Sequence, residues 1–387
     1  MFRHNPSNPL MRAAALTGVF LVAVACAGPA ATTRPATPAA SSAPSTSSSS
    51  APTTGGAATD APATDAPTAD PAASPTPTPF QAQPGAVTLV AYSTPREAYA
   101  ELIPAFQGSD AGAGSTFEES YGGSGDQSRA VLAGLPADVV ALALWPDVEK
   151  LVEPGIVADD WDENEYGGII HDSVVVFDVR PGNPKNIQTW DDLIRDDVTV
   201  ITPNPITSGG AQWNILAAYQ AQIDAGKSED EAIAYLEELA QHVLVWDPSA
   251  RDALNTFLQA GQGDVLIGYE NEAIFAQQSG QPLDYVVPDS TLLIENAIAP
   301  TTVGDAPDEA QAFVDFLYTP EAQTVYGNHG FRPILPDVLA QFDTFPTPTN
   351  LATVNDDLGG WAEARPKFFD PDEGIMAQIF SDLGIEN

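Results

Sequence analysis

The chain has 387 residues, and its 53 Asp and Glu residues far outnumber its 14 Lys and Arg residues, giving a formal net charge of -39. This charge argues against nucleic acid and against an anionic membrane face as partners. It does not exclude a small anionic ligand, because surface charges are screened over about 8 Å at physiological salt and local donors then decide what binds. The length suffices for a leader and a two-domain body. The single cysteine, Cys26, excludes an intrachain disulfide.

The first 25 residues predict a signal peptide. Arg3 and Arg12 precede an apolar run, residues 13–25, that is shorter than the roughly 20 residues needed to span a membrane. The run ends in Ala23-Val-Ala-Cys26, which resembles a bacterial lipobox with Ala23 in place of the usual leucine. We therefore expect cleavage before Cys26 and lipidation of this cysteine, which would hold the protein on the outer side of a membrane. The alternative is a secretory signal without lipidation.

Residues 26–85 predict a lipidated N-terminus followed by a disordered tether. The segment is almost entirely Ala, Pro, Thr and Ser, has no apolar periodicity and cannot bury a core. Its prolines favour an extended chain. Positive and negative residues cancel before residue 86, so the whole acidic excess belongs to the body that follows.

The body alternates strands with helices. Apolar and β-branched runs predict strands over residues 87–91, 116–121, 138–144, 174–179, 198–201, 243–246 and 264–269, with an extended run over 292–300. Helical spacing and start signals predict helices over residues 95–106, from 124, 190–194, 213–223, 228–240, from 249, from 270, 306–317 and 320–329, with helical pieces and loops beyond. This alternation predicts an α/β fold with mostly parallel sheets.

The stretch over residues 202–214 joins a predicted strand to a helix through a Pro-rich turn. Ser208 is suited to cap that helix, and Gly209 and Gly210 leave the first-turn amides uncovered by side chains. Free amides at the positive end of a helix dipole form a seat for an anion. A short Gly-rich turn is a weak signal by itself, so an ordinary Ser-capped helix is the alternative.

Two further helix starts have the same character. Ser124 follows a strand in a Gly-rich turn, and Ser249 follows the strand that ends at Trp246. In α/β sheets, ligands bind beyond the carboxyl ends of strands, where helices begin. We therefore expect the starts at Ser124, Ser208 and Ser249 to converge on one site.

These stretches together resemble the sulfate-binding proteins of ABC importers. The matching motifs are Tyr121-Gly-Gly-Ser-Gly, Ala137-Asp-Val-Val-Ala-Leu-Ala-Leu144, Arg180-Pro-Gly-Asn-Pro-Lys185, Ile201-Thr-Pro-Asn-Pro, Thr207-Ser-Gly-Gly-Ala-Gln-Trp-Asn214, Gly263-Asp-Val-Leu-Ile267, Glu270-Asn-Glu-Ala273, Phe331-Arg-Pro333 and Gly359-Gly-Trp361. The likeness runs from about Val87 to the C-terminus. It implies a two-lobed type II periplasmic-binding-protein fold, in which each lobe is a mostly parallel sheet flanked by helices. Lobe 1 would comprise residues 86–172 plus 295–387, and lobe 2 residues 173–294.

The resemblance also implies a ligand and its donors. In this family sulfate is buried between the lobes and held by neutral donors, mostly backbone amides, before delivery to a membrane permease. On this sequence the implied donors are the amides of Ser93, Ser124, Gly209, Gly210 and Ala250 and the hydroxyls of Ser208 and Tyr269. Ser93 stands where the family usually has Asp, and Tyr269 where it has Trp. A phenol can donate one hydrogen bond as an indole can, although its reach differs.

Related oxyanions remain open as ligands. Sulfate at neutral pH has no proton to donate, so donors without carboxylates suit it, whereas protonated phosphate would need a buried acceptor and is least favoured. Thiosulfate, molybdate and tungstate are tetrahedral alternatives. Glu270 and Glu272 lie close to the implied site in sequence, and we interpret them as structural residues of the lobe.

Other function classes fit less well. None of the four histidines lies in metal-ligand spacing or beside a candidate nucleophile, so we expect no enzyme, no cofactor and no metal site. A cation-binding acidic surface protein would suit the net charge, but the sequence has no Asp-rich loop of calcium spacing. We expect a monomeric, extracytoplasmic, membrane-anchored lipoprotein.

Overall fold

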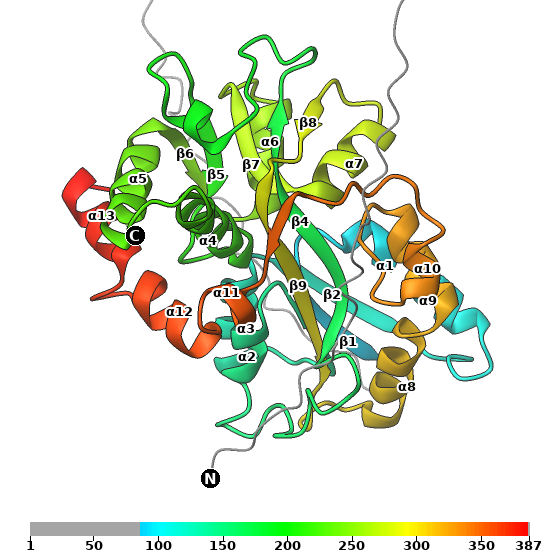
Figure 1. Ribbon diagram of the computed structural model, residues 1–387. Helices are drawn as coiled ribbons and strands as arrows, with labels where there is room; N and C mark the ends of the chain where they lie inside the picture. Colours follow the sequence, from blue (N-terminus) through cyan, green and yellow to red (C-terminus); the bar gives the residue numbers. More distant parts are fainter. Residues whose placement is uncertain (1–85, 386–387) are drawn as a thin grey trace, which may run out of the picture. The chain divides into compact units, whose positions relative to one another are not determined.

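A computed structural model describes residues 86–385; the predicted signal peptide, Cys26 and the tether lie outside the described residues. The strands are β1 (Val87–Tyr92), β2 (Phe117–Gly122), β3 (Val139–Leu142), β4 (Ile169–Val179), β5 (Val200–Pro203), β6 (Val243–Asp247), β7 (Val265–Tyr269), β8 (Asp284–Val286), β9 (Ser290–Pro300) and β10 (Asn350–Ala352). Helices cover the resulting sheet (Figure 1), so the predicted α/β class is confirmed.

The helices follow the predicted order. They are α1 (Arg96–Gly108), α2 (Ser124–Leu132), α3 (Trp145–Glu149), α4 (Gly209–Asp224), α5 (Glu229–His242), α6 (Ala250–Leu258), α7 (Glu270–Gln278), α8 (Pro307–Leu317), α9 (Pro320–Asn328), α10 (Pro336–Leu339), α11 (Val354–Asp357), α12 (Trp361–Phe369) and α13 (Ile375–Leu383), with a 3-10 turn over Trp190–Ile194. α4 begins at Gly209, directly after Ser208, as predicted from Ser208 as its N-cap, and it includes the apolar stretch expected over 213–223.

Two groups of parallel strands make up the sheet. β2, β1 and β3 pair in parallel, as do β7, β5 and β6. Between the groups lie the two long strands β4 and β9, which are antiparallel to each other. β4 pairs with β9 in its first half and with β7 in its second, and β9 continues from β4 to β3. Each long strand therefore contributes to both groups.

This arrangement supports the predicted division into two lobes at β4 and β9, with lobe 1 discontinuous in sequence, which we keep as a proposal. The β1 group packs against α1, α8 and α9 on one face and against α2 and α3 on the other. The β5 group packs against α4 and α5 on one face and α6 and α7 on the other. Burial on both faces explains why these strands read as continuous apolar runs rather than alternating ones.

The C-terminal helices pack differently from the predicted assignment of residues 295–387 to lobe 1. The Trp361 ring of α12 stands edge-on to Trp213 of α4, with centroids 4.9 Å apart. In α13, Phe380 packs against Trp246 of β6 at 4.8 Å. Aromatic burial thus ties α12 and α13 to the β5 group, and we propose that these helices belong to lobe 2.

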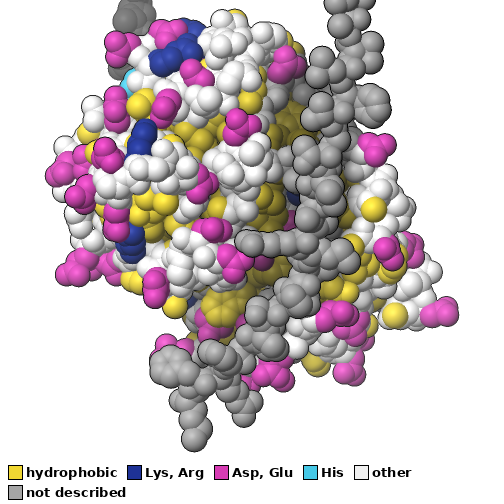
Figure 2. Space-filling model, viewed as in Figure 1, with side chains coloured by type: hydrophobic (Ala, Val, Ile, Leu, Met, Phe, Trp, Pro, Cys, Tyr) yellow, Lys and Arg dark blue, Asp and Glu magenta, His cyan; other side chains and the backbone are white. Residues whose placement is uncertain are grey.

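The surface of the body is strongly acidic. Asp and Glu side chains are spread over the visible face, with Lys and Arg in a few places (Figure 2). Within residues 86–385, no helix combines the length and the apolar character that a membrane crossing requires.

Candidate functional site

The turn before α4 positions Ser208, whose hydroxyl makes no capping hydrogen bond. The Asn204 carbonyl accepts from the Ser208 amide at 2.9 Å, and the Asn204 amide donates to the Asp247 carbonyl at 2.7 Å, which fixes the turn to β6. Ser208 is the N-cap of α4, yet its side chain makes no capping bond. It is 3 % exposed. The hydroxyl predicted to cap the helix is therefore available for a ligand.

At the start of α2, the Ser124 hydroxyl is hydrogen-bonded within the protein, unlike the Ser208 hydroxyl. The Ser124 hydroxyl donates to Asp147 Oδ2 at 2.8 Å and accepts from the Ala143 amide at 3.0 Å. The backbone amide of Ser124, as the first in the helix, has no intrahelical acceptor. The side chain thus orients the helix start and leaves the amide in the first turn; that this amide donates to a ligand stays a prediction.

The start of α6 is capped by the residue before Ala250. The Ser249 hydroxyl accepts from the Asp252 amide at 3.2 Å. Ala250 is the first residue of α6, so its own amide lies in the uncapped first turn. Next in the chain, Arg251 forms ion pairs with Glu97 of α1 and Glu272 of α7.

Close approaches at Gly210 bring three predicted donors together. A Cβ atom at Gly210 would lie 3.3 Å from Ser208 Oγ, 3.3 Å from Cε1 of Tyr269 and 3.4 Å from the Ala250 Cβ. Three segments far apart in the sequence, the starts of α4, α6 and α7, therefore meet at this glycine.

The start of α2 joins the same place through Gly209 and Gly123. A Cβ at Gly209 would lie 3.1 Å from the Ser124 Cβ and 2.9 Å from the Ala143 Cβ. A Cβ at Gly123 would lie 2.5 Å from the carbonyl oxygen of Thr207, before α4, and 3.0 Å from that of Pro248, before α6. Only glycine permits this packing, so the three predicted helix starts do converge.

Tyr269 closes the site from the end of β7. Its side chain is fully buried, and its hydroxyl finds no hydrogen-bond partner among residues 86–385. Burial raises the pKa of this phenol well above its usual value, so the group stays a proton donor at every physiological pH. A buried, unpaired donor costs roughly 1–3 kcal/mol, which favours a ligand as its missing partner.

Ser93 lies at the edge of this cluster. It is partly buried in the turn between β1 and α1. The carbonyl of the next residue, Thr94, accepts from Arg251 Nη2 at 3.1 Å, which puts the turn beside the start of α6. That the Ser93 amide donates to a ligand stays a prediction.

The two nearby glutamates are engaged elsewhere. Glu270 Oε2 lies 2.7 Å from Arg332 Nε, and Glu272 Oε2 lies 2.7 Å from Arg251 Nε. Burial raises the pKa of both carboxyl groups, and their arginine partners oppose that shift. These contacts agree with the interpretation of both residues as structural.

Sequence reasoning missed two residues that hold the site. Asp147 orients Ser124, and Arg251 links α6 to α1. Arg251 directly follows a predicted donor, which is the one signal that could have singled it out. Asp147 carries no signal, because its partner lies 23 positions away in the sequence. No group of three or more His, Cys, Asp or Glu within residues 86–385 is arranged to hold a metal ion.

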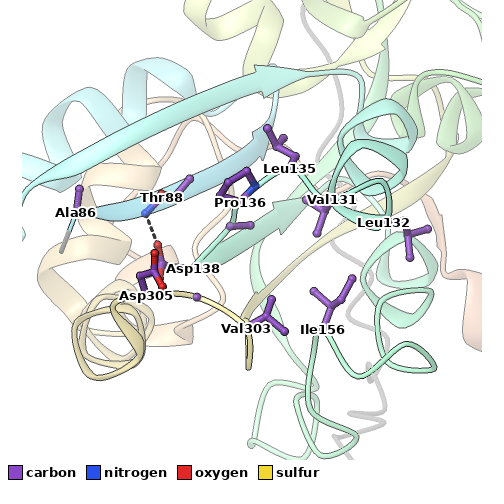
Figure 3. A pocket seen from close by; sticks show the side chains of 13 residues that line it. Ala86, Thr88, Val131, Leu132, Leu135, Pro136, Asp138, Ile156, Val303 and Asp305 are labelled. Atoms are coloured by element: carbon purple, nitrogen blue, oxygen red, sulfur yellow. Dashed lines mark hydrogen bonds between the residues drawn. The ribbon is translucent and has the colours of Figure 1, made fainter. Parts of the chain in front are cut away.

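A groove elsewhere on the body lacks these features. It has a volume of about 410 Å³ and lies between β1, the end of α2 and the segment after β9 (Figure 3). Its lining is mainly apolar and contains none of the predicted donors. Asp138, its buried carboxylate, is satisfied by the amides of Thr88 and Ala306, both at 2.8 Å. We therefore assign the site to the converging helix starts.

Comparisons with known proteins place the chain in a family. A model of bacterial extracellular solute-binding proteins matches residues 87–332. A sulfate-binding protein from Synechocystis is 39% identical over 311 residues, covering 78% of this chain and 88% of the relative. A thiosulfate-binding protein from Pseudomonas aeruginosa is 35% identical over 306 residues, covering 76% of this chain and 91% of the relative.

A solved structure agrees with these relatives. The sulfate-binding protein SubI from Mycobacterium tuberculosis H37Rv is 46% identical, with a TM-score of 0.71, and the match covers 74% of this chain and 99% of that one. The predicted type II periplasmic-binding-protein fold is confirmed. This chain belongs to the bacterial extracellular solute-binding protein family.

Proposed function

We propose that the protein binds sulfate between its two lobes and delivers it to the membrane permease of an ABC importer. One observation carries the proposal: the starts of α2, α4 and α6 meet at Gly209 and Gly210 beside a Tyr269 hydroxyl that has no partner among the described residues. The names of the relatives, sulfate-binding and thiosulfate-binding proteins, support this ligand class. The proposed role is binding and transport, without catalysis or a cofactor.

The chemistry of the site suits a fully ionised oxyanion. The proposed donors are the amides of Ser93, Ser124, Gly209, Gly210 and Ala250 and the hydroxyls of Ser208 and Tyr269. All are neutral, and three helix dipoles point their positive ends at one place. The nearby carboxylates of Asp147 and Glu272 are held by cations or hydroxyl donors. None of the proposed donors is a carboxylate that could accept the proton of a protonated phosphate.

Tyr269 bears on the choice among oxyanions. It is fully buried, so its hydroxyl has a fixed reach into the site. Sulfate is the ligand we propose, and thiosulfate, molybdate and tungstate differ from it in size and in the atoms they present. Direct comparison of the affinities for these four anions therefore tests which oxyanion the site prefers.

The family implies an extracytoplasmic location. We propose in addition that Cys26 is lipidated, that residues 27–85 tether the body to the membrane, and that the protein works as a monomer. The lipobox-like Ala23-Val-Ala-Cys26 and the Ala- and Pro-rich composition of the tether support the anchor.

Calorimetric titration and thermal unfolding of the mature chain test the proposed ligand. Sulfate should raise the melting temperature, because a ligand at about 1,000 times its Kd adds about 4.1 kcal/mol to the stability of the state it binds. Thiosulfate, molybdate, tungstate and phosphate form the comparison series, and Ca²⁺ represents the cation-binding alternative. Stabilisation by Ca²⁺ with none by any oxyanion would reverse the assignment.

A further inference from the structure

A cationic pocket lies outside the proposed sulfate site. It has a volume of about 360 Å³, and its lining includes Arg129, Lys150, Pro205, Ile206, Gln212 and Arg365. We call it the seam pocket. Three of the 14 Lys and Arg residues in a chain of net charge -39 therefore line a single pocket. This concentration of positive charge is unlike the rest of the acidic surface.

Two cations of the seam pocket, Lys150 and Arg365, share one carboxylate, that of Asp147. Lys150 Nζ lies 3.4 Å and Arg365 Nη2 2.8 Å from the same oxygen of buried Asp147. The other nitrogen of the guanidinium, Arg365 Nη1, is buried and has no hydrogen-bond partner within residues 86–385. Burial lowers the pKa of Lys150, the charge of Asp147 opposes that shift, and the charges of Arg365 and Arg129 add to it. Lys150, Arg365 and Asp147 together carry one net positive charge.

The remaining acids near the pocket are also occupied. Asp126 is paired with Arg129 across one turn of α2. Asp370, the acid that lines the pocket, accepts the amides of Asp372 and Glu373 at 3.0 and 2.9 Å through Oδ1. The three acids Asp126, Asp147 and Asp370 balance the three cations, so an anion entering the seam pocket would meet three cations in a region that is neutral in sum, unlike the acidic surface of the body.

The pocket borders the proposed site directly. Arg129 Nη1 donates to the Ile206 carbonyl at 3.2 Å, which links α2 to the turn before Ser208. A Cβ atom at Gly125 would lie 3.3 Å from Arg129 Nη1 and from the carbonyl oxygens of Ile206 and Thr207. The pocket therefore opens where α2, with its Ser124 amide, meets the start of α4.

We propose that the seam pocket is a capture site for small dianionic oxyanions, from which the anion passes into the site between the lobes. A dianion approaching a protein of charge -39 is repelled at long range, and a region where cations balance the acids lowers this barrier and raises the association rate. In the proposed sulfate site between the lobes the anion is held by neutral groups. The seam pocket would therefore speed association, and the site between the lobes would set how long the anion stays bound. This inference rests on the proposed sulfate function.

Stopped-flow measurement of sulfate binding by tryptophan fluorescence tests the capture site. Trp213 and Trp246 lie in the elements next to the proposed site and supply the signal. The double variant Arg129→Gln/Lys150→Gln should lower the association rate constant about three- to tenfold at low ionic strength. The effect should vanish in about 1 M NaCl, where the screening length is about 3 Å.

Two matched variants make the result decisive. Lys185→Gln/Arg195→Gln removes the same charge from a cluster around Asp197, away from the pocket, and should change the association rate little. Arg129→Lys/Lys150→Arg keeps both charges and should keep the rate. Equal association rates in the pocket and control variants, or an effect confined to dissociation, would overturn the capture site. If the unsubstituted protein binds no sulfate, the proposed function fails first, and that outcome is visible before any variant is made.

Discussion

Arg251 of α6 reaches across to Glu97 of α1, with Nη1 2.7 Å from Oε1 and Nη2 2.9 Å from Oε2. The same guanidinium is bound to Glu272, so one side chain holds α6, α7 and α1 together. Burial raises the pKa of Glu97, but the contacts with Arg251 outweigh it and leave that pKa below its ordinary value. Because Ala250 directly precedes Arg251, the Arg251–Glu97 contact joins α6 to α1 next to the Ala250 amide, a proposed ligand donor.

Replacing Glu97 with Gln should therefore weaken sulfate binding. The pair is partly exposed, so we expect a modest loss, about three- to tenfold in Kd, through faster dissociation. Calorimetric titration and stopped-flow dissociation measure it. Glu101→Gln removes the same charge from α1, where the partner is His329 rather than α6, and should leave the affinity unchanged. An equal effect of both substitutions would show that net charge, not the link to α6, matters.

Ser208→Ala should lower the affinity without unfolding the body. The hydroxyl makes no capping bond, so its loss costs little stability, whereas a hydrogen bond to a dianion is worth about 1.5–3 kcal/mol. We expect roughly a ten- to a hundredfold rise in Kd by calorimetry. Ser249→Ala is the matched control, because that hydroxyl does cap a helix and its loss should cost about 1 kcal/mol of stability. A lower melting temperature with unchanged affinity would assign Ser208 a structural role.

Tyr269→Phe removes a buried hydroxyl that has no partner among the described residues. The ligand-free protein should be as stable as the parent or more so, because an unsatisfied polar group is lost. Sulfate affinity should fall, because a donor to the anion is lost with it. Chemical unfolding and calorimetric titration measure the two effects separately. A fall in stability with normal affinity would mean that the hydroxyl serves the fold and not the ligand.

His171 should make stability depend on pH. It is fully buried against Phe331 and Tyr326, and burial lowers its pKa to about 3. Between about pH 6.5 and pH 3 the unfolded chain binds a proton that the folded protein does not, so unfolding becomes easier as pH falls, by up to about 1.4 kcal/mol per pH unit. Above pH 6.5 the ring is neutral in both states and adds no pH dependence.

The variant His171→Phe isolates this contribution. Denaturant unfolding of the parent and the variant should give free energies whose difference changes as pH falls from 7 to about 4.5, because the other titrating groups are common to both. His242→Phe, at a partly buried ring, serves as the control. Parallel curves for parent and His171→Phe would refute the assignment.

Cys26→Ala should release the protein from the membrane. The proposed anchor is a lipid on this cysteine, and no other cysteine exists in the chain to replace it. Fractionation of cells with an antibody to the body measures the shift from membrane to soluble fraction. Thr33→Ala in the tether is the control and should stay membrane-bound. Retention of the Cys26 variant in the membrane would disprove the lipobox interpretation.

Much of the fold was predictable because local signals agreed with the tertiary structure. The strands β3 and β5 are short apolar runs, and they are buried on both faces as such runs predict. α5 begins at Glu229, after the N-cap Ser228, which forms a capping box with Glu231. The elements α3, β8 and β10 were not predicted, because each spans five residues or fewer and is too short for a periodic pattern.

The sequence by itself indicated the candidate donors, since Gly209 and Gly210 carry no side chain that could cover the first-turn amides of a helix. Only the tertiary structure decided that the starts of α2, α4 and α6 meet, and that Ser208 keeps its hydroxyl free while Ser249 uses its own for a cap. It also decided that α12 packs on α4 and that Arg251 meets Glu97 across 154 positions. Such contacts depend on packing between distant segments, and no local preference of the chain encodes them.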